Sequence, residues 1–156
     1  MSDELEQMKQ VIIIGGGLVG GLTALLLAQG GVQATVLDAA PILDETAVLS
    51  VTNPRVLALS QASIHLLKQV SVWEKIARQM PYTGMQVWNK NGYGEINFGQ
   101  ESKTTPSAEQ CLGSMVEPSL LNLAIQQQML IAVQDYRTQV KVVRIERGVN
   151  CWIVKL

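Results

Sequence analysis

Residues 10–38 read QVIIIGGGLVGGLTALLLAQGGVQATVLD, and within them two apolar runs flank a cluster of glycines and a leucine-rich segment. Val and Ile dominate residues 10–14 without polar alternation, which predicts a strand buried on both faces of a parallel sheet. Residues 18–29 repeat apolar side chains at helical spacing, and two glycines then predict the end of the helix. Residues 32–37 predict a second buried strand. This order predicts a βαβ unit with a right-handed crossover.

A G-x-G-x-x-G pattern at Gly15, Gly17 and Gly20 lies directly between the predicted strand and the predicted helix. In such a turn Gly15 allows the tight bend, Gly17 lets the backbone approach a pyrophosphate, and Gly20 lets helix and strand pack closely. The N–H groups at the start of the helix, at Leu18 and Val19, would then stabilise the phosphates together with the helix dipole. Alone, the pattern would also fit a simple turn.

Asp38 ends the second predicted strand, 18 residues after Gly20. A carboxylate in that place accepts hydrogen bonds from both hydroxyls of an adenosine ribose and disfavours a 2′-phosphate. The alternative is a solvated acid at a strand end. Because strand, glycine turn, helix, second strand and acid occur together, we interpret residues 8–38 as a dinucleotide-binding unit. The motif itself fits FAD and NAD alike, since both contain the same ADP half.

Composition and charge exclude several classes of function. A chain of 156 residues with 47% hydrophobic content is long enough for one packed domain. The net charge of -1 offers no basic field for a phosphate backbone, so we expect no nucleic-acid partner. Cys111 and Cys151 lie far apart, which suggests neither a disulfide framework nor a metal site and fits a cytoplasmic compartment. Glycines interrupt the apolar run at 11–28 and acidic residues precede it, which argues against a membrane span or a signal peptide.

The rest of the chain predicts further helices and strands. In chain order, these are a surface connection over 38–54, a mostly helical segment over 55–80 that Pro81 ends, a β-hairpin over 84–99 around Asn91-Gly92, a loop over 101–110, a helix from Pro118 to about Val133, and strands over 140–145 and 152–156. We expect the hairpin to lie outside the nucleotide fold. The single histidine, His65, is expected on a helix surface or in packing rather than in catalysis, and Trp88 is expected to anchor a core. The apolar C-terminal strand predicts that the chain continues in a longer protein.

Residues 11–21 resemble the FAD-binding start of the aromatic-ring hydroxylases. Four further places resemble one branch of these enzymes: NPRVLALS at 53–60, LL at 66–67 with VW at 72–73, GMQVWNK at 84–90, and VE at 116–117 leading into the predicted helix. This branch is the ubiquinone-biosynthesis prenylphenol hydroxylases, which include the 2-octaprenylphenol and 2-octaprenyl-6-methoxyphenol hydroxylases. The resemblance extends from residue 11 to about residue 125 and favours FAD over NAD.

The resemblance implies an α/β fold, a Rossmann-like FAD-binding domain with a parallel sheet and a crossover helix, to which the hairpin at 84–99 adds a substrate-side layer. Residues 1–156 would then be the N-terminal FAD-binding portion of a longer flavoprotein monooxygenase. In this family NAD(P)H reduces FAD, and the reduced cofactor activates oxygen for hydroxylation of a prenylated phenol. Because the cofactor supplies the chemistry, no catalytic acid or base is expected from the protein. The lipid tail of such a substrate implies peripheral association with the inner membrane from the cytoplasm.

The resemblance also implies two cofactor contacts outside the βαβ unit. The arginine of the family that matches Arg55 lies near the flavin, and the polar residue that matches Asn122 on the following helix contacts the cofactor. The alternatives are a surface cation at a helix start for Arg55 and a solvent-facing helix residue for Asn122.

This sequence departs from the family in three respects, one of which is an abbreviated join from the predicted helix into the strand at Val140. Ala39 and Ala40 follow Asp38 where the family has a basic or polar residue, which leaves the adenine contacts open. The family's later Asp-Gly and Gly-Asp flavin motifs are absent from this sequence, so the 156-residue chain alone is expected to be inactive. Two other interpretations remain: a non-catalytic nucleotide-binding fragment, and another FAD- or NAD-dependent oxidoreductase.

Overall fold

The computed structural model describes residues 11–99, 111–149 and 151–156, so the loop predicted over 101–110 lies outside the described residues. The chain divides into two compact units. Of the described residues, those up to Glu45 and those from Asn122 onward form the first unit, and those of Thr46–Leu121 form the second.

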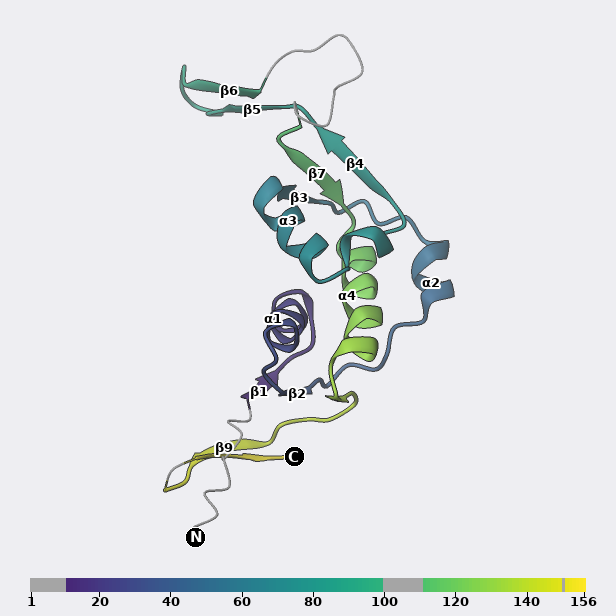
Figure 1. Ribbon diagram of the computed structural model, residues 1–156. Helices are drawn as coiled ribbons and strands as arrows, with labels where there is room; N and C mark the ends of the chain where they lie inside the picture. The colour runs from purple at the N-terminus through teal and green to yellow at the C-terminus, as the bar shows by residue number, and fades with distance from the viewer. Residues whose placement is uncertain (1–10, 100–110, 150) are drawn as a thin grey trace. The chain divides into compact units, whose positions relative to one another are not determined.

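A three-stranded parallel sheet forms the centre of the first unit (Figure 1). Its strand order is β1-β2-β8, with β1 at Val11–Ile14, β2 at Ala34–Leu37 and β8 at Asp135–Arg137. Helix α1, Leu18–Gln29, connects β1 to β2 and has the bounds that the sequence predicts. The predicted βαβ unit is therefore confirmed, whereas the short strand β8 was not predicted.

Glycine at position 21 lets α1 approach α4 (Pro118–Ala132) closely within the first unit. A side-chain carbon added at Gly21 would lie 2.4 Å from Cγ2 of Ile125, so no larger residue fits there. Ala24, Ile125 and Met129 are at most 1% exposed and belong to the core of this unit.

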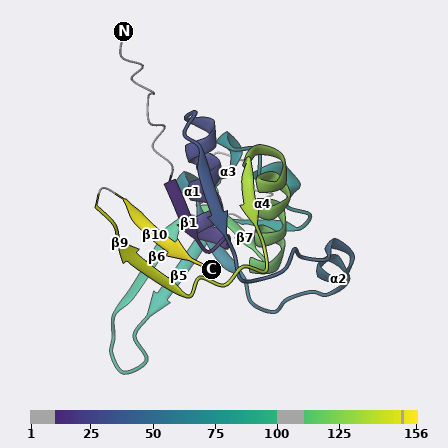
Figure 2. The same ribbon diagram turned by 90° about the horizontal axis from the view of Figure 1, so that it is seen from below.

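Strand β1 is less enclosed than the sequence predicts. Ile12 and Ile14 expose 42% and 50% of their surface. Ile13 pairs in register with the fully buried Val36, and both lie on the face that carries the helices. Figure 2 shows α1 and α4 on the same side of the sheet. The prediction of burial on both faces was therefore wrong, because among the described residues helices cover one face only.

The second unit contains an antiparallel sheet with the order β3-β7-β4. Its strands are Leu57–Ser60, Gly113–Val116 and Gln79–Tyr82, respectively. Helix α3, Gln61–Gln69, directly follows β3, and η1 at Trp73–Lys75 follows α3. The segment from α3 to the residue after η1 buries the apolar side chains Ile64, Leu67, Val70, Val72 and Ile76.

The prediction of a mostly helical segment over 55–80 was wrong in its extent. Ser60 ends β3 and caps α3, because its hydroxyl accepts a hydrogen bond from the N–H of Ser63. Ser71 has a φ of 57°, a left-handed conformation that does not continue a helix. Pro81 lies within β4 instead of ending a helix, and it is accommodated because β4 is an edge strand.

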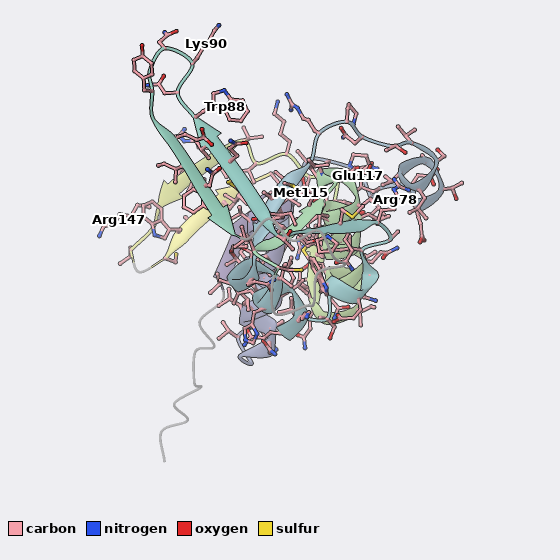
Figure 3. The ribbon with its side chains drawn as sticks, turned by 90° about the horizontal axis from the view of Figure 1, so that it is seen from above. Arg78, Trp88, Lys90, Met115, Glu117 and Arg147 are labelled. Atoms are coloured by element: carbon pink, nitrogen blue, oxygen red, sulfur yellow. The ribbon has the colours of Figure 1, made fainter. Side chains whose placement is uncertain are left out.

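Two β-hairpins form separate two-stranded sheets. Strands β5 (Gly84–Trp88) and β6 (Glu95–Gly99) pair antiparallel, as the Asn91-Gly92 turn predicts. Strands β9 (Arg144–Arg147) and β10 (Trp152–Lys155) form the other hairpin, in which the first strand begins later than predicted. Trp88 is 69% exposed (Figure 3), so its prediction as a core anchor was wrong.

The connection predicted over 38–54 carries a helix of its own. Helix α2 occupies Glu45–Ser50 and contains no buried residue. Its six residues have little apolar periodicity, which explains why the sequence pattern did not reveal it. No helix in the described parts of the chain has the length and apolar character needed to cross a membrane.

Candidate dinucleotide-binding site

The turn from β1 into α1 depends on the backbone of Gly15. Its φ is +99°, a conformation that favours glycine. Its N–H donates to the carbonyl of Leu37 over 2.8 Å, which holds the turn against the end of β2. The position of Gly15 thus agrees with the tight bend predicted from the glycine pattern.

Gly17 and Gly20 have opposite surroundings. A Cβ at Gly20 would lie 1.9 Å from the carbonyl oxygen of Gly15, so helix and turn are too close for any side chain there. A Cβ at Gly17 would meet no atom within 4 Å. Gly20 therefore serves the packing of the protein itself, whereas the space beside Gly17 is open to a ligand.

The first turn of α1 presents uncapped N–H groups at its positive end. Gly17 is the N-cap residue and has no side chain to accept a hydrogen bond, and the first turn contains no acidic residue. The N–H groups of Leu18 and Val19 have no partner within the helix, since the first four N–H groups of any helix lack one. Val19 is 81% exposed. Such an end attracts an anion through its N–H groups and its dipole.

The carboxylate of Asp38 lies beside the glycine turn. Its Oδ2 accepts a hydrogen bond from the N–H of Gly16, and its Oδ1 accepts one from the N–H of Ala40, both at 2.9 Å. The side chain is half-buried, and each carboxylate oxygen can accept a further bond. The structure therefore brings Asp38 and the turn at 15–20 together in one unit, where hydroxyl donors of a ligand could reach the carboxylate.

Arg55 and Asn122 lie apart from this turn in the sequence and belong to different units. Arg55 is exposed and precedes β3, so it does not stand at a helix start. Its N–H donates to Oδ1 of Asn53 over 2.9 Å. Asn122 is half-buried on α4. Their roles in cofactor binding remain predictions from the resemblance.

Two residues near the turn, Tyr136 and Gln126, were not predicted from the sequence. Tyr136 on β8 would lie 3.1 Å, through its ring carbon Cε2, from a Cβ placed on Gly16. Gln126 on α4 donates through Nε2 to the Tyr136 hydroxyl over 3.1 Å. Strand β8 has only three residues, too few to produce a recognisable alternation.

A half-buried ion pair in the second unit, between Arg78 and Glu117, was not predicted from the sequence either. Arg78 Nε donates to Glu117 Oε1 over 2.8 Å, and the Glu117 side chain is only 9% exposed (Figure 3). The N–H of Asn53 donates to Glu117 Oε2 over 2.7 Å. The hydrogen bond from Arg78 is the main reason that the pKa of Glu117 lies below its ordinary value, and the bond from Asn53 lowers this pKa further.

Arg78 also holds the segment that precedes Asn53. Its guanidinium donates to the carbonyls of Leu49 over 3.2 Å and Val51 over 3.0 Å. Arg78 directly precedes β4, and Glu117 directly precedes α4. Their ion pair therefore connects the starts of these two elements to the segment that leads to Arg55. In the sequence, Glu117 stood out only as part of the VE at 116–117 that resembles the family. No sequence pattern pointed to Arg78.

Other candidate sites are weaker. His65 is exposed on α3, as expected of a helix-surface residue. Among the residues that the structure describes, no group of three or more His, Cys, Asp or Glu side chains could hold a metal ion.

Comparison with known proteins identifies related sequences over most of the chain. The FAD binding domain family matches residues 8–148. The 3-demethoxyubiquinol 3-hydroxylase of Escherichia coli strain K12 is 34% identical over 126 residues, which are 78% of this chain and 30% of that protein. The ubiquinone hydroxylase UbiL of Rhodospirillum rubrum is 30% identical over 122 residues, which are 77% of this chain and 27% of that protein. The chain thus spans less than a third of the length of these relatives.

Solved structures share the fold. The tetrameric form of 2-methyl-3-hydroxypyridine-5-carboxylic acid oxygenase matches with a TM-score of 0.59 at 14% identity, over 88% of this chain and 33% of that one. A mutant of the same oxygenase matches with a TM-score of 0.61 at 12% identity, with the same coverage. These similarities support the α/β, Rossmann-like architecture. Because the family match includes the glycine turn, Asp38 and both described units, the chain belongs to the FAD binding domain family.

Proposed function

We propose that residues 1–156 are the N-terminal FAD-binding portion of a flavoprotein monooxygenase that hydroxylates the ring of a prenylated phenol in ubiquinone biosynthesis. One observation carries the cofactor part of this proposal: the uncapped start of α1 and the Asp38 carboxylate lie at the same glycine turn. The relatives named ubiquinone hydroxylase and 3-demethoxyubiquinol 3-hydroxylase support the substrate class.

The residues of the turn fit the ADP half of FAD. The open space at Gly17 would admit the pyrophosphate, and the N–H groups of Leu18 and Val19 would donate to its oxygens. Asp38 would accept hydrogen bonds from the ribose hydroxyls. On the flavin side, we propose contacts from Arg55 and Asn122, as the resemblance implies.

FAD, once reduced by NAD(P)H, supplies the activation of oxygen in this proposal. The protein binds and orients the cofactor and keeps water away from the reacting ring. No acid or base of this chain is assigned a catalytic role. The hairpin β5–β6, within residues 84–99, would contribute to the substrate-side layer, since it is the hairpin that the resemblance places outside the nucleotide fold.

The proposed substrate carries a long apolar tail and therefore resides in a membrane. We propose that the protein acts from the cytoplasm at the surface of the inner membrane. Vesicle flotation with and without a prenylated phenol would measure this association.

The activity is tested by incubating the protein with FAD, NAD(P)H, a prenylated phenol and labelled oxygen gas. Mass spectrometry should then detect a product that is heavier by one labelled oxygen atom. A longer chain that continues beyond residue 156 is expected to form this product, and residues 1–156 alone are not, because they span only 30% of the first relative. A protein that binds FAD but leaves prenylated phenols unchanged would contradict the substrate class. A protein that binds no nucleotide would contradict the function as a whole.

A further inference from the structure

Tyr136 packs its ring against the backbone of Gly16, beside the Asp38 carboxylate. A Cβ added at Gly16 would lie 3.1 Å from Cε2 and 3.3 Å from Oη of Tyr136, and 2.8 Å from Oδ2 of Asp38. Gly16 is therefore enclosed between the phenol and the carboxylate that we propose to hold the ribose. The half-buried Tyr136 ring thus fills the space next to the turn on this side.

Gln126 fixes the hydroxyl of Tyr136 from α4. Its Nε2 donates to Tyr136 Oη over 3.1 Å, and its Oε1 accepts a hydrogen bond from the N–H of Leu43 over 2.6 Å. Only 6% of Gln126 is exposed. Removal of either partner would leave a buried polar group unpaired, which is more costly than the loss of an exposed hydrogen bond. This amide thus connects β8 to the segment that follows Asp38.

The segment from Asp38 to Leu43 is held at both ends. At its start, the N–H of Asp38 donates to the carbonyl of Arg137 over 2.8 Å. At its end, Leu43 donates to Gln126. Because the Asp38 side chain reaches from this segment to the N–H of Gly16, the orientation of its carboxylate depends on both attachments.

The surroundings of Tyr136 favour its neutral phenol, chiefly through burial. Burial is the main cause that raises the pKa of Tyr136, and the negative charge of Asp38 raises this pKa further, while the hydrogen bond from Gln126 acts in the opposite direction. The hydroxyl therefore stays protonated at neutral pH. It adds no second negative charge next to Asp38, where the phosphates of a nucleotide would approach.

We propose that Tyr136 and Gln126 are positioning residues for the ADP half of the cofactor. Together they hold the Asp38 carboxylate and the glycine turn in the arrangement that the ribose and the pyrophosphate require. Neither residue needs to touch the nucleotide, because the Tyr136 hydroxyl and the Gln126 amide act through the segment that carries Asp38. This inference rests on the proposed function.

The test is a double-mutant cycle on FAD affinity. Tyr136→Phe, which keeps the ring and removes the hydroxyl, should weaken FAD binding by about threefold to tenfold, the range expected for the loss of one hydrogen bond. Gln126→Ala should weaken it at least as much. In an Asp38→Ala background, Tyr136→Phe should change the dissociation constant for FAD by less than about twofold, because the carboxylate that it positions is absent. Titration followed by flavin fluorescence measures each dissociation constant.

The matched control is Tyr93→Phe, which removes the same hydroxyl from a fully exposed tyrosine outside the first unit and should leave FAD affinity unchanged. Urea unfolding without FAD separates stability from binding. The positioning role is overturned if Tyr136→Phe lowers the stability of the fold but leaves FAD affinity unchanged. It is also overturned if Tyr136→Phe weakens FAD binding equally in the unaltered protein and in the Asp38→Ala variant. If Asp38→Ala itself binds FAD like the unaltered protein, the proposed ribose site is wrong, and the positioning role with it.

Discussion

Gly17→Ala should separate nucleotide binding from folding. The added Cβ would meet no protein atom within 4 Å, and a φ of -71° with a ψ of -162° suits alanine. Alanine is a poorer N-cap than glycine by up to about 1 kcal/mol. The lower entropy of the unfolded chain offsets this by about 0.4 to 1 kcal/mol. The free energy of unfolding should therefore change by less than about 1 kcal/mol.

The same methyl group should impair FAD binding strongly. It would occupy the space through which the pyrophosphate approaches the backbone, and a hydrogen bond to a charged group contributes about 1.5 to 3 kcal/mol. Loss of one such bond corresponds to a dissociation constant at least about tenfold higher. Fluorescence titration with FAD measures this change, and urea unfolding without FAD measures stability.

Two further glycine variants serve as controls. Gly20→Ala places a Cβ 1.9 Å from the Gly15 carbonyl oxygen, so it should destabilise the fold by about 1 to 3 kcal/mol or more. Gly94→Ala adds a methyl group to open space in the β5–β6 hairpin and should change neither quantity. If Gly17→Ala binds FAD as tightly as the unaltered protein does, the pyrophosphate does not approach Gly17, and the assignment of the turn is refuted.

The purified protein should release FAD, identified by chromatography; release of NAD, or no nucleotide after reconstitution with excess FAD, would contradict the cofactor. Asp38→Ala should raise the dissociation constant for FAD by about tenfold or more, because hydrogen bonds from the ribose to a charged acceptor are lost; an unchanged value would make Asp38 a bystander. Glu117→Gln should reduce the acid sensitivity of the fold in urea unfolding at different pH values. Since the pKa of Glu117 lies below its ordinary 4.5, this residue stabilises the fold above that pH, and the contribution is lost as the pH falls through the lower value; an unaltered pH dependence in the variant would contradict this.

The βαβ unit was predictable because its signals are local. Gly15 meets a backbone requirement and Gly20 a steric one within the turn itself, and α1 has a long apolar segment ended by Gly30. The hairpin at Asn91-Gly92 was predictable for the same reason, since its turn lies between its own two strands. Local chemistry fixed these elements, so the sequence alone sufficed for them.

Elements that depend on distant partners were missed. Strand β7 pairs with β3 and β4, which lie far from it in the sequence, and its four residues show no alternation of polar and apolar side chains. The roles of Tyr136 and Arg78 depend on contacts 10 and 39 residues away, with Gln126 and Glu117 respectively. No pattern within a short window reports such contacts, so the hydrogen bonds of Tyr136 and Arg78 could not be predicted from the sequence.

A crystal structure of the protein reconstituted with FAD would locate the ADP half of the cofactor directly. The pyrophosphate should lie at the N–H groups of Leu18 and Val19, beside Gly17, with the ribose hydroxyls donating to the Asp38 carboxylate. An ADP half bound away from this turn, or a ribose without contact to Asp38, would contradict the proposed site.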